Sequence, residues 1–204
     1  MSDALLRGSD GKRRCWWGAS SAEYASYHDE EWGRPVRGDD ELFERLCLEG
    51  FQSGLSWITI LRKRENFRAA FADFRIEAVA AFGARDVKRL LNDAGIVRNR
   101  MKIEAAIGNA RAAAALDTAL SELLWSYAEP RRKAPRSRDD LVPTTPASIA
   151  LSKELKRRGF RFVGPTTVYS TMQACGLVND HISGCHVRGE VERQQRGARS
   201  DSPH

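Results

Sequence analysis

The 204-residue sequence has no run of about 18 apolar residues, the length that a helix needs to cross a membrane. Its first residues, MSDALLRGSDGKRRCWW, also lack the apolar core of a secretory signal peptide. These absences argue against an integral membrane protein and against a secreted one. We therefore expect a cytoplasmic protein without a membrane partner.

Cysteine is scarce, with four residues in the whole chain. In a reducing compartment so few thiols argue against a disulfide framework and leave metal binding, catalysis or simple burial. Cys47 and Cys175 lie inside the apolar runs LFERLCLEGF and STMQACGLV, where a thiol acts as a small core residue. Cys15 and Cys185 lie near the two ends of the chain, each close to a histidine. The second pair is therefore the one placed for chemistry.

The sequence also lacks internal repeats and any convincing alternation of apolar and polar residues, which disfavours repeat and β-rich folds. Pro146 after Thr145, and Pro165, mark helix starts, whereas Gly159 and Gly176 mark helix ends. The predicted fold class is all-α, apart from irregular terminal segments. The predicted helices cover ELFERLCLEG, RDVKRLLNDAG, NRMKIEAAIGNARAAAA, ASIALSKELKRR and TTVYSTMQAC.

One helical domain is expected over residues 14–186. The stretch 128–146 is rich in proline and basic residues and predicts an exposed connection within that domain. Residues 1–13 predict a flexible tail, and the polar residues 187–204 predict a disordered one.

Basic residues outnumber acidic ones by 33 to 27, and the net charge of +6 is compatible with a polyanionic partner without requiring one. Several of them surround a glycine turn, Gly95, in RDVKRLLNDAGIVRNRMKI. Such a turn can present backbone N–H groups to a phosphate, with cationic side chains around it. An ordinary helical hairpin with a solvated basic face explains the same pattern equally well.

Two cysteines and two histidines form a complete set of tetrahedral zinc ligands. Cys15 and His28 are separated by twelve residues, and HISGC places His181 and Cys185 four apart. This spacing matches no common zinc finger, so separate buried thiols and surface imidazoles remain the alternative. A site made of all four leaves no position for an activated water and would be structural.

The stretch LCLEGFQSGLSWITIL, residues 46–61, contains a single charge, Glu49. At helical spacing Leu48, Phe51, Leu55 and Ile58 form an apolar stripe, and the polar face beside Glu49 has no Lys or Arg. Two glycines in the same stretch each cost about 1 kcal/mol in a helix, which suggests that another helix or a ligand approaches the backbone. A core helix with one paired carboxylate is the simpler interpretation of this stretch alone.

Aromatic residues crowd the segment around the first two candidate ligands, Cys15 and His28. Such a density can fill a core or build a stacking pocket for a flat ligand. Tyr24 and Tyr27 each need a hydrogen-bond partner if buried, which favours the edge of a site for at least one of them. The aromatic residues are Trp16, Trp17, Tyr24, Tyr27 and Trp32, together with Trp57 from the stretch around Glu49.

Taken together, these stretches resemble the 3-methyladenine DNA glycosylase I family of DNA-repair enzymes. The resemblance runs from about Cys15 to Cys185. Its carriers are CWW, YASYHDEEWG, LFERLCLEGFQSGLSWITILRKRENFRAAF, LLNDAGIVRNRMKI and GFRFVGPTTVYSTMQACGLVNDH followed by ISGC. The chain then continues HVRGEVERQQRG, to which nothing from the family carries over.

The resemblance implies a helix-hairpin-helix fold in which residues 93–97 contact the DNA backbone. It implies one structural Zn²⁺ that joins the N- and C-terminal segments, held by Cys15, His28, His181 and Cys185. The implied catalytic residues are Glu49 and Tyr27, and the implied substrate-binding residues are Trp17, Tyr24 and Trp57. The implied DNA contacts are Leu55, close to the displaced base, and Gly95, Arg98, Arg100 and Lys102.

The activity implied by the resemblance is hydrolysis of the N-glycosidic bond of 3-methyladenine in alkylated double-stranded DNA by a monofunctional, monomeric enzyme. Adenine methylated at N3 is a flat cation in DNA, so aromatic faces and a dry carboxylate such as Glu49 suit it. The base must be flipped out of the duplex to reach them. The alternative is a non-enzymatic module that binds damaged DNA; a zinc hydrolase is disfavoured because the ligand set is closed.

Overall fold

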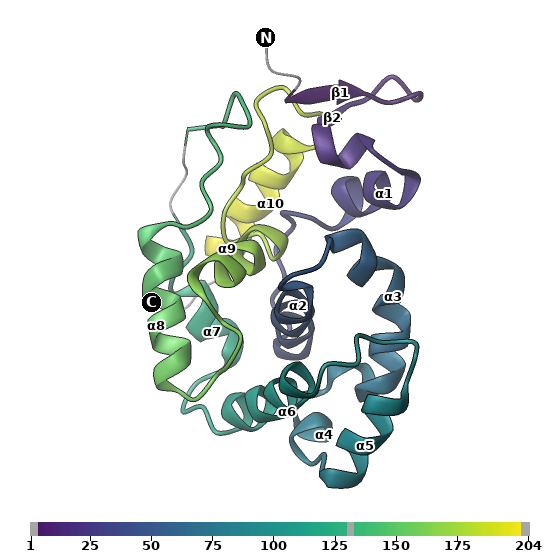
Figure 1. The fold of residues 1–204 in the computed structure, drawn as a ribbon. Helices are drawn as coiled ribbons and strands as arrows, with labels where there is room; N and C mark the ends of the chain where they lie inside the picture. The colour runs from purple at the N-terminus through teal and green to yellow at the C-terminus, as the bar shows by residue number, and fades with distance from the viewer. Residues whose placement is uncertain (1–3, 130–132, 201–204) are drawn as a thin grey trace.

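The computed structural model describes residues 4–129 and 133–200 (Figure 1). The structure is mostly helical, as predicted, and no helix in this part of the chain is long and apolar enough to span a bilayer. The elements are β1 (Leu5–Arg7), β2 (Arg13–Cys15), η1 (Trp16–Ala19), α1 (Ala22–Glu30), α2 (Asp39–Gln52), α3 (Trp57–Ala70), η2 (Ala72–Phe74), α4 (Ile76–Ala80), α5 (Ala84–Asn92), α6 (Arg100–Ala114), α7 (Leu120–Trp125), α8 (Pro146–Arg157), α9 (Pro165–Ala174) and α10 (Arg188–Ser200).

Helix α2 lies at the centre, with α3 on one side and α9 on the other (Figure 1). Leu42, Phe43, Leu48 and Phe51 are each at most 1% exposed, so the helix is buried on several faces. Burying apolar surface in this way is the main source of stability, at about 25 cal/mol per Å². The central position of α2 fixes the place of every residue that it carries, Glu49 included.

The capping signals of the last two core helices work as predicted. The Thr145 side chain accepts from the backbone N–H of Ser148 at 3.2 Å, and Pro146 opens α8. Gly176 follows α9 with φ +78°, and a Cβ there would meet the backbone of Arg34 at 2.7 Å. Glycine is therefore required at this position both by its φ and by the close approach of the chain.

The terminal segments differ from the prediction. The expected flexible tail contains the antiparallel hairpin β1–β2, in which Leu5 pairs with Cys15. The prediction of a disordered C-terminal tail is wrong for residues 188–200, which form α10. Val191 is fully buried, and Gln195 Nε2 donates to the carbonyl oxygens of Gly33 and Val178 at 2.8 and 3.2 Å. These few contacts hold a helix that is otherwise polar; residues 1–3 and 201–204 lie outside the described residues.

The helical stripe predicted through residues 46–61 is also broken. Helix α2 ends at Gln52, Gly54 has φ +82°, and α3 begins only at Trp57. Leu55 is consequently 42% exposed in the turn rather than packed in the core. The turn brings the end of α2 and the start of α3 to the same region of the molecule.

Candidate functional site

A pocket of about 280 Å³ lies where the aromatic N-terminal segment meets α2, α3 and α9. Its volume suits one small planar molecule, and no Lys or Arg belongs to its wall as far as the chain is described. The pocket contains all five residues expected to form a base-binding site. The lining residues are Trp16, Trp17, Tyr24, Tyr27, Trp32, Glu49, Gln52, Trp57, Leu141, Ser170 and Gln173.

The aromatic walls hold one another in place. The Trp17 ring stands edge-on to Trp32, with centroids 5.0 Å apart, and to Tyr24 at 5.8 Å. The Tyr27 and Trp57 rings lie 5.4 Å apart at an angle of 44°. Edge-to-face and tilted pairs of this kind are favourable arrangements of aromatic quadrupoles. The pocket is thus formed by rings that are fixed by their neighbours.

Glu49 enters the pocket from the last turn of α2 and is only 6% exposed. Burial raises the pKa of its carboxyl group to about 8, and the positive charge of Arg45 opposes that rise. Burial, followed by the nearby Glu49, raises the pKa of Tyr27 well above its ordinary value. A tyrosine that stays neutral therefore adjoins a carboxyl group whose charge depends on its surroundings.

The two tyrosines have different positions in the site. Tyr24 Oη accepts a hydrogen bond from the backbone N–H of Ile58 at 3.0 Å. This N–H belongs to the first turn of α3, whose N-cap, Ser56, makes no side-chain capping bond. Tyr24 therefore anchors the start of α3 and with it Trp57. Tyr27 is almost completely buried between Trp17 and Trp57.

The predicted hairpin is present between α5 and α6. The Asp93 side chain accepts from the Gly95 N–H at 2.7 Å, and Lys63 Nζ donates to the Gly95 carbonyl at 3.1 Å. A Cβ at Gly95 would lie 2.9 Å from Asp93 Oδ1 and 3.1 Å from Asn66 Cβ, so close packing requires glycine there. Arg98, after the turn, is exposed.

Arg100 begins α6 and is exposed, with Nη1 3.3 Å from Glu104. Lys102, expected to contact phosphate, is instead 9% exposed, and its ammonium donates to the carbonyl oxygens of Phe51 and Ser53 at 2.8 and 2.5 Å. Burial also lowers its pKa. The phosphate contact of Lys102 stays a prediction, and in this structure the cation satisfies carbonyl groups at the end of α2.

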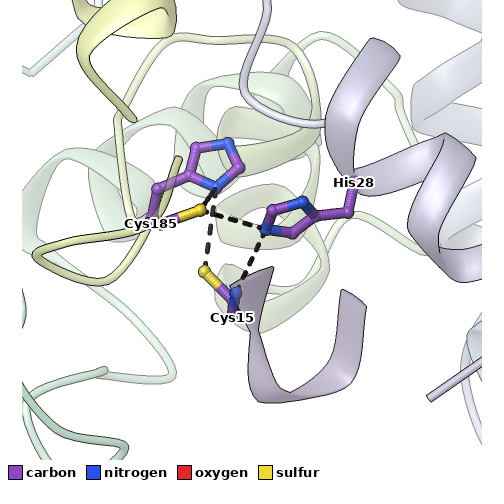
Figure 2. Close-up of side chains that lie close together, drawn as sticks. Cys15, His28 and Cys185 are labelled. Atoms are coloured by element: carbon purple, nitrogen blue, oxygen red, sulfur yellow. Dashed lines mark hydrogen bonds between the residues drawn. The ribbon is translucent and has the colours of Figure 1, made fainter. Parts of the chain in front are cut away.

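The four predicted metal ligands lie together in a second buried cluster, although they come from opposite ends of the chain (Figure 2). Cys185 Sγ lies 3.5 Å from His28 Nε2 and 3.7 Å from His181 Nδ1, and Cys15 Sγ lies 3.7 Å from His181 Nδ1. All four donor atoms are within 4.8 Å of one another. The group could hold one metal ion.

The outer hydrogen bonds of the two imidazoles fit metal binding. Asp29 Oδ1 lies 2.8 Å from His28 Nδ1, and the Trp32 carbonyl oxygen lies 3.1 Å from His181 Nε2. Because both oxygens accept, they place N–H on these ring atoms and leave a lone pair on each nitrogen that faces the thiols. A hydrogen bond from the Cys15 thiol holds the pKa of the Cys185 thiol below its ordinary value. The donor set thus fits a divalent ion on its own chemistry.

The family model described as methyladenine glycosylase matches residues 16–188. The chain belongs to the methyladenine glycosylase family. It is 50% identical to DNA-3-methyladenine glycosylase 1 of Escherichia coli (strain K12) over 177 residues, which is 84% of this chain and 95% of that protein. It is 44% identical to DNA-3-methyladenine glycosylase of Haemophilus influenzae over 179 residues, covering 84% of this chain and 96% of the relative. The resemblance inferred from the motifs is confirmed.

Solved structures give the same result. A crystal structure of 3-methyladenine DNA glycosylase I superimposes with a TM-score of 0.82 at 50% identity, covering 85% of this chain and 98% of that chain. A variant of 3-methyladenine DNA glycosylase I in complex with 3-methyladenine also gives a TM-score of 0.82, at 36% identity, with coverage of 86% and 97%. The fold is therefore that of this family of enzymes.

Sequence reasoning missed residues that contact the side chains of the aromatic pocket and of the Cys/His cluster. Asp29, which orients His28, follows it directly in the chain, and Arg45 precedes Glu49 by one helical turn. Both residues could have been found from their spacing in the sequence relative to His28 and Glu49. Ser170 and Gln173, on the pocket side of α9, could not be assigned to it without the packing of α9 on α2.

Proposed function

We propose that this protein excises 3-methyladenine from alkylated double-stranded DNA by hydrolysing its N-glycosidic bond and releasing the free base. The observation that carries the proposal is a nearly dry carboxyl group, Glu49, in an aromatic pocket of a methyladenine glycosylase. Relatives at 44–50% identity are DNA-3-methyladenine glycosylases, and a solved neighbour holds 3-methyladenine.

The pocket fits the chemistry of this lesion. A base methylated at N3 of adenine carries a positive charge, so its glycosidic bond is already weak and its ring is attracted to the faces of Tyr27 and Trp57. An ionised Glu49 complements the charge and accepts from the exocyclic amine through a charge-assisted hydrogen bond. Because the leaving group needs little protonation, discrimination against normal bases is the main task of the site.

The DNA-binding surface that we propose includes the hairpin at residues 93–97 and two exposed arginines. Arg98 and Arg100 follow the turn at Gly95 and supply positive charge for the backbone. Leu55 is exposed in the turn between α2 and α3, and in this proposal it occupies the space of the displaced base. Backbone contacts would position the duplex, and the pocket would select the lesion.

For the second cluster we propose one structural Zn²⁺, held by Cys15, His28, His181 and Cys185. Two thiols and two imidazoles match the ligand preferences of zinc, and the four protein ligands complete a tetrahedral set. Each ligand is at most 6% exposed, which supports a structural rather than a hydrolytic role. When bound, the ion would cross-link β2 and α1 to the segment before α10.

Release of free base from methylated duplex DNA tests the proposed activity. Chromatography with mass detection should show 3-methyladenine and leave abasic DNA with uncut strands. Borohydride should trap no covalent adduct, because no lysine lines the pocket in the described residues and the Lys102 amine is held by backbone carbonyls. Damaged DNA that binds tightly but loses no base would instead identify a binding module.

A further inference from the structure

A row of alternating charges lies behind the pocket and joins α1, α2 and α3. Glu31, the C-cap residue of α1, accepts from Arg45 Nη2 at 2.7 Å. The same carboxylate accepts from Arg64 Nη1 and Nη2 at 2.5 and 2.8 Å. Arg45 and Arg64 thus share one carboxylate, and one of their two positive charges has no direct counterion in this group.

Arg45 is the member that faces Glu49. The two residues are four apart in α2, so their side chains leave the same side of the helix. The Arg45 side chain is 14% exposed, and its buried Nη1 has no hydrogen-bond partner among the residues that the structure describes. Glu31 pairs with Nη2 of this guanidinium and leaves Nη1 without a partner in the described part of the chain. Burial of such a group destabilises the fold unless a further negative charge lies nearby.

Glu49 needs a positively charged neighbour if its buried carboxyl group is to ionise. Its carboxyl group loses most of its hydration in the pocket, and desolvation favours the neutral acid. A neutral acid would give the pocket no charge to set against a cationic base. Tyr27 and Cys175, which interact with Glu49, are a neutral phenol and a buried thiol, and Glu31 carries a negative charge, so none of the three favours ionisation of Glu49.

We propose that Arg45 is a positioning residue that favours the ionised form of Glu49 in the pocket, while Glu31 balances Arg45 so that it does not repel the cationic base. The proposal rests on the proposed excision of a cationic base, which gives an ionised Glu49 its use. Arg64 has a supporting role, since it holds Glu31 in place from α3.

The direct test is the titration of Glu49 by carbon-13 NMR of glutamate carboxyl groups, with Glu49→Gln used to assign the signal. In Arg45→Met the apparent pKa of Glu49 should rise by about one unit or more, the size expected for a nearby charge in a partly buried site. Arg64→Met removes the same charge from the same Glu31 carboxylate and is the matched control. It should leave the titration of Glu49 close to that of the wild type.

The pH profile of excision gives the second readout. Near neutral pH Arg45→Met should excise about tenfold more slowly, because about one unit of pKa shift leaves tenfold less ionised Glu49. The variant should approach the wild type as the pH rises past the shifted pKa. A merely structural Arg45 would give a loss that is the same at every pH. If Arg45→Met does not fold, Arg45→Gln, which can still donate to Glu31, takes its place.

An unchanged Glu49 titration in the folded variant would overturn the proposal, as would an excision defect independent of pH. Arg45→Lys should restore both profiles, since it returns the charge without the planar fork. The NMR titration does not depend on activity. Wild-type protein that releases no base would therefore refute the proposed function while still reporting whether Arg45 controls Glu49.

Discussion

At the scale of single residues, Glu49→Gln separates recognition from folding. The substitution keeps the size and hydrogen-bonding reach of the side chain but removes a charge-assisted hydrogen bond, worth roughly 1.5–3 kcal/mol. Excision of 3-methyladenine should fall by about ten- to a hundredfold. Binding to abasic DNA should hardly change, because backbone contacts supply most of that affinity. Normal excision by a variant that melts much lower would make Glu49 a structural residue.

Titration of Glu49 also makes the stability of the wild type depend on pH, and Glu49→Gln removes that dependence. The folded-state pKa of Glu49 is raised to about 8 from 4.5, so the fold favours the protonated acid. Its contribution to stability is complete below 4.5 and is lost as the pH rises through about 8. The melting temperature of Glu49→Gln relative to the wild type should therefore increase between about pH 5 and pH 9. Calorimetry across that range measures the difference.

Tyr24→Phe tests the different roles of the two tyrosines. The variant removes the acceptor for the Ile58 N–H at the start of α3, and we expect a loss of about 1 kcal/mol in the free energy of unfolding. Because α3 carries Trp57, excision should decrease in parallel with looser placement of that ring. Urea unfolding and excision assays measure both quantities. Wild-type stability with strongly impaired excision would place the Tyr24 hydroxyl in direct contact with the base.

At the scale of helices and turns, the prediction from sequence succeeded where a local cap or a packed apolar face defines an element. Examples are the start of α8, which Thr145 caps, the start of α9, which Pro165 opens, and the hairpin at Gly95. It failed for α10, in which Val191 is fully buried, because polar composition hides a helix held by a few long-range contacts. The break at Gly54 was missed for a related reason, since apolar spacing alone does not reveal a positive φ.

Lys102 shows how burial changes the interpretation of a basic residue. In Lys102→Met two carbonyl groups at the end of α2 lose their donor, and we expect a loss of about 1–3 kcal/mol in the free energy of unfolding. The salt dependence of DNA binding should stay as in the wild type. Arg98→Met is the matched control: it should leave stability unchanged and reduce the salt slope by about one unit.

Fluorescence titrations at several salt concentrations, together with urea unfolding, measure both effects. A Lys102→Met protein with wild-type stability and a reduced salt slope would show that Lys102 contacts DNA phosphate. The pair of variants thus distinguishes a cation that completes a helix from one that is available to phosphate.

At the scale of the whole molecule, the cluster of Cys15, His28, His181 and Cys185 joins segments that are far apart in the chain. Residue types predicted the ligand set, but spacing could not show that Cys15 and Cys185 meet, because their contact depends on the packing of every helix between them. A small second core surrounds the ligands and connects the N-terminal hairpin to α10. Its buried residues are Ala4, Cys15, Ile182, Cys185, Val187 and Val191.

This arrangement predicts that loss of one ligand will loosen both termini while leaving α2 and its neighbours folded. Cys185→Ala should bind less than one zinc per chain and melt well below the wild type, because metal affinity in structural sites contributes about 10 kcal/mol of apparent folding energy. Cys175→Ala is the matched control, since Cys175 is a fully buried thiol outside the cluster. It should keep its zinc and lose only the stability of a small core truncation.

Elemental analysis and hydrogen exchange distinguish the two variants. Exchange in Cys185→Ala should increase in β1, β2 and α10, which the cluster joins, and stay low in α2 and α6, which belong to the main core. Acid should reproduce the effect in the wild type, because the thiols and imidazoles must be deprotonated to hold the ion. Wild-type protein that contains no zinc, with melting unchanged by Cys185→Ala, would show that the four side chains form an ordinary hydrogen-bonded core.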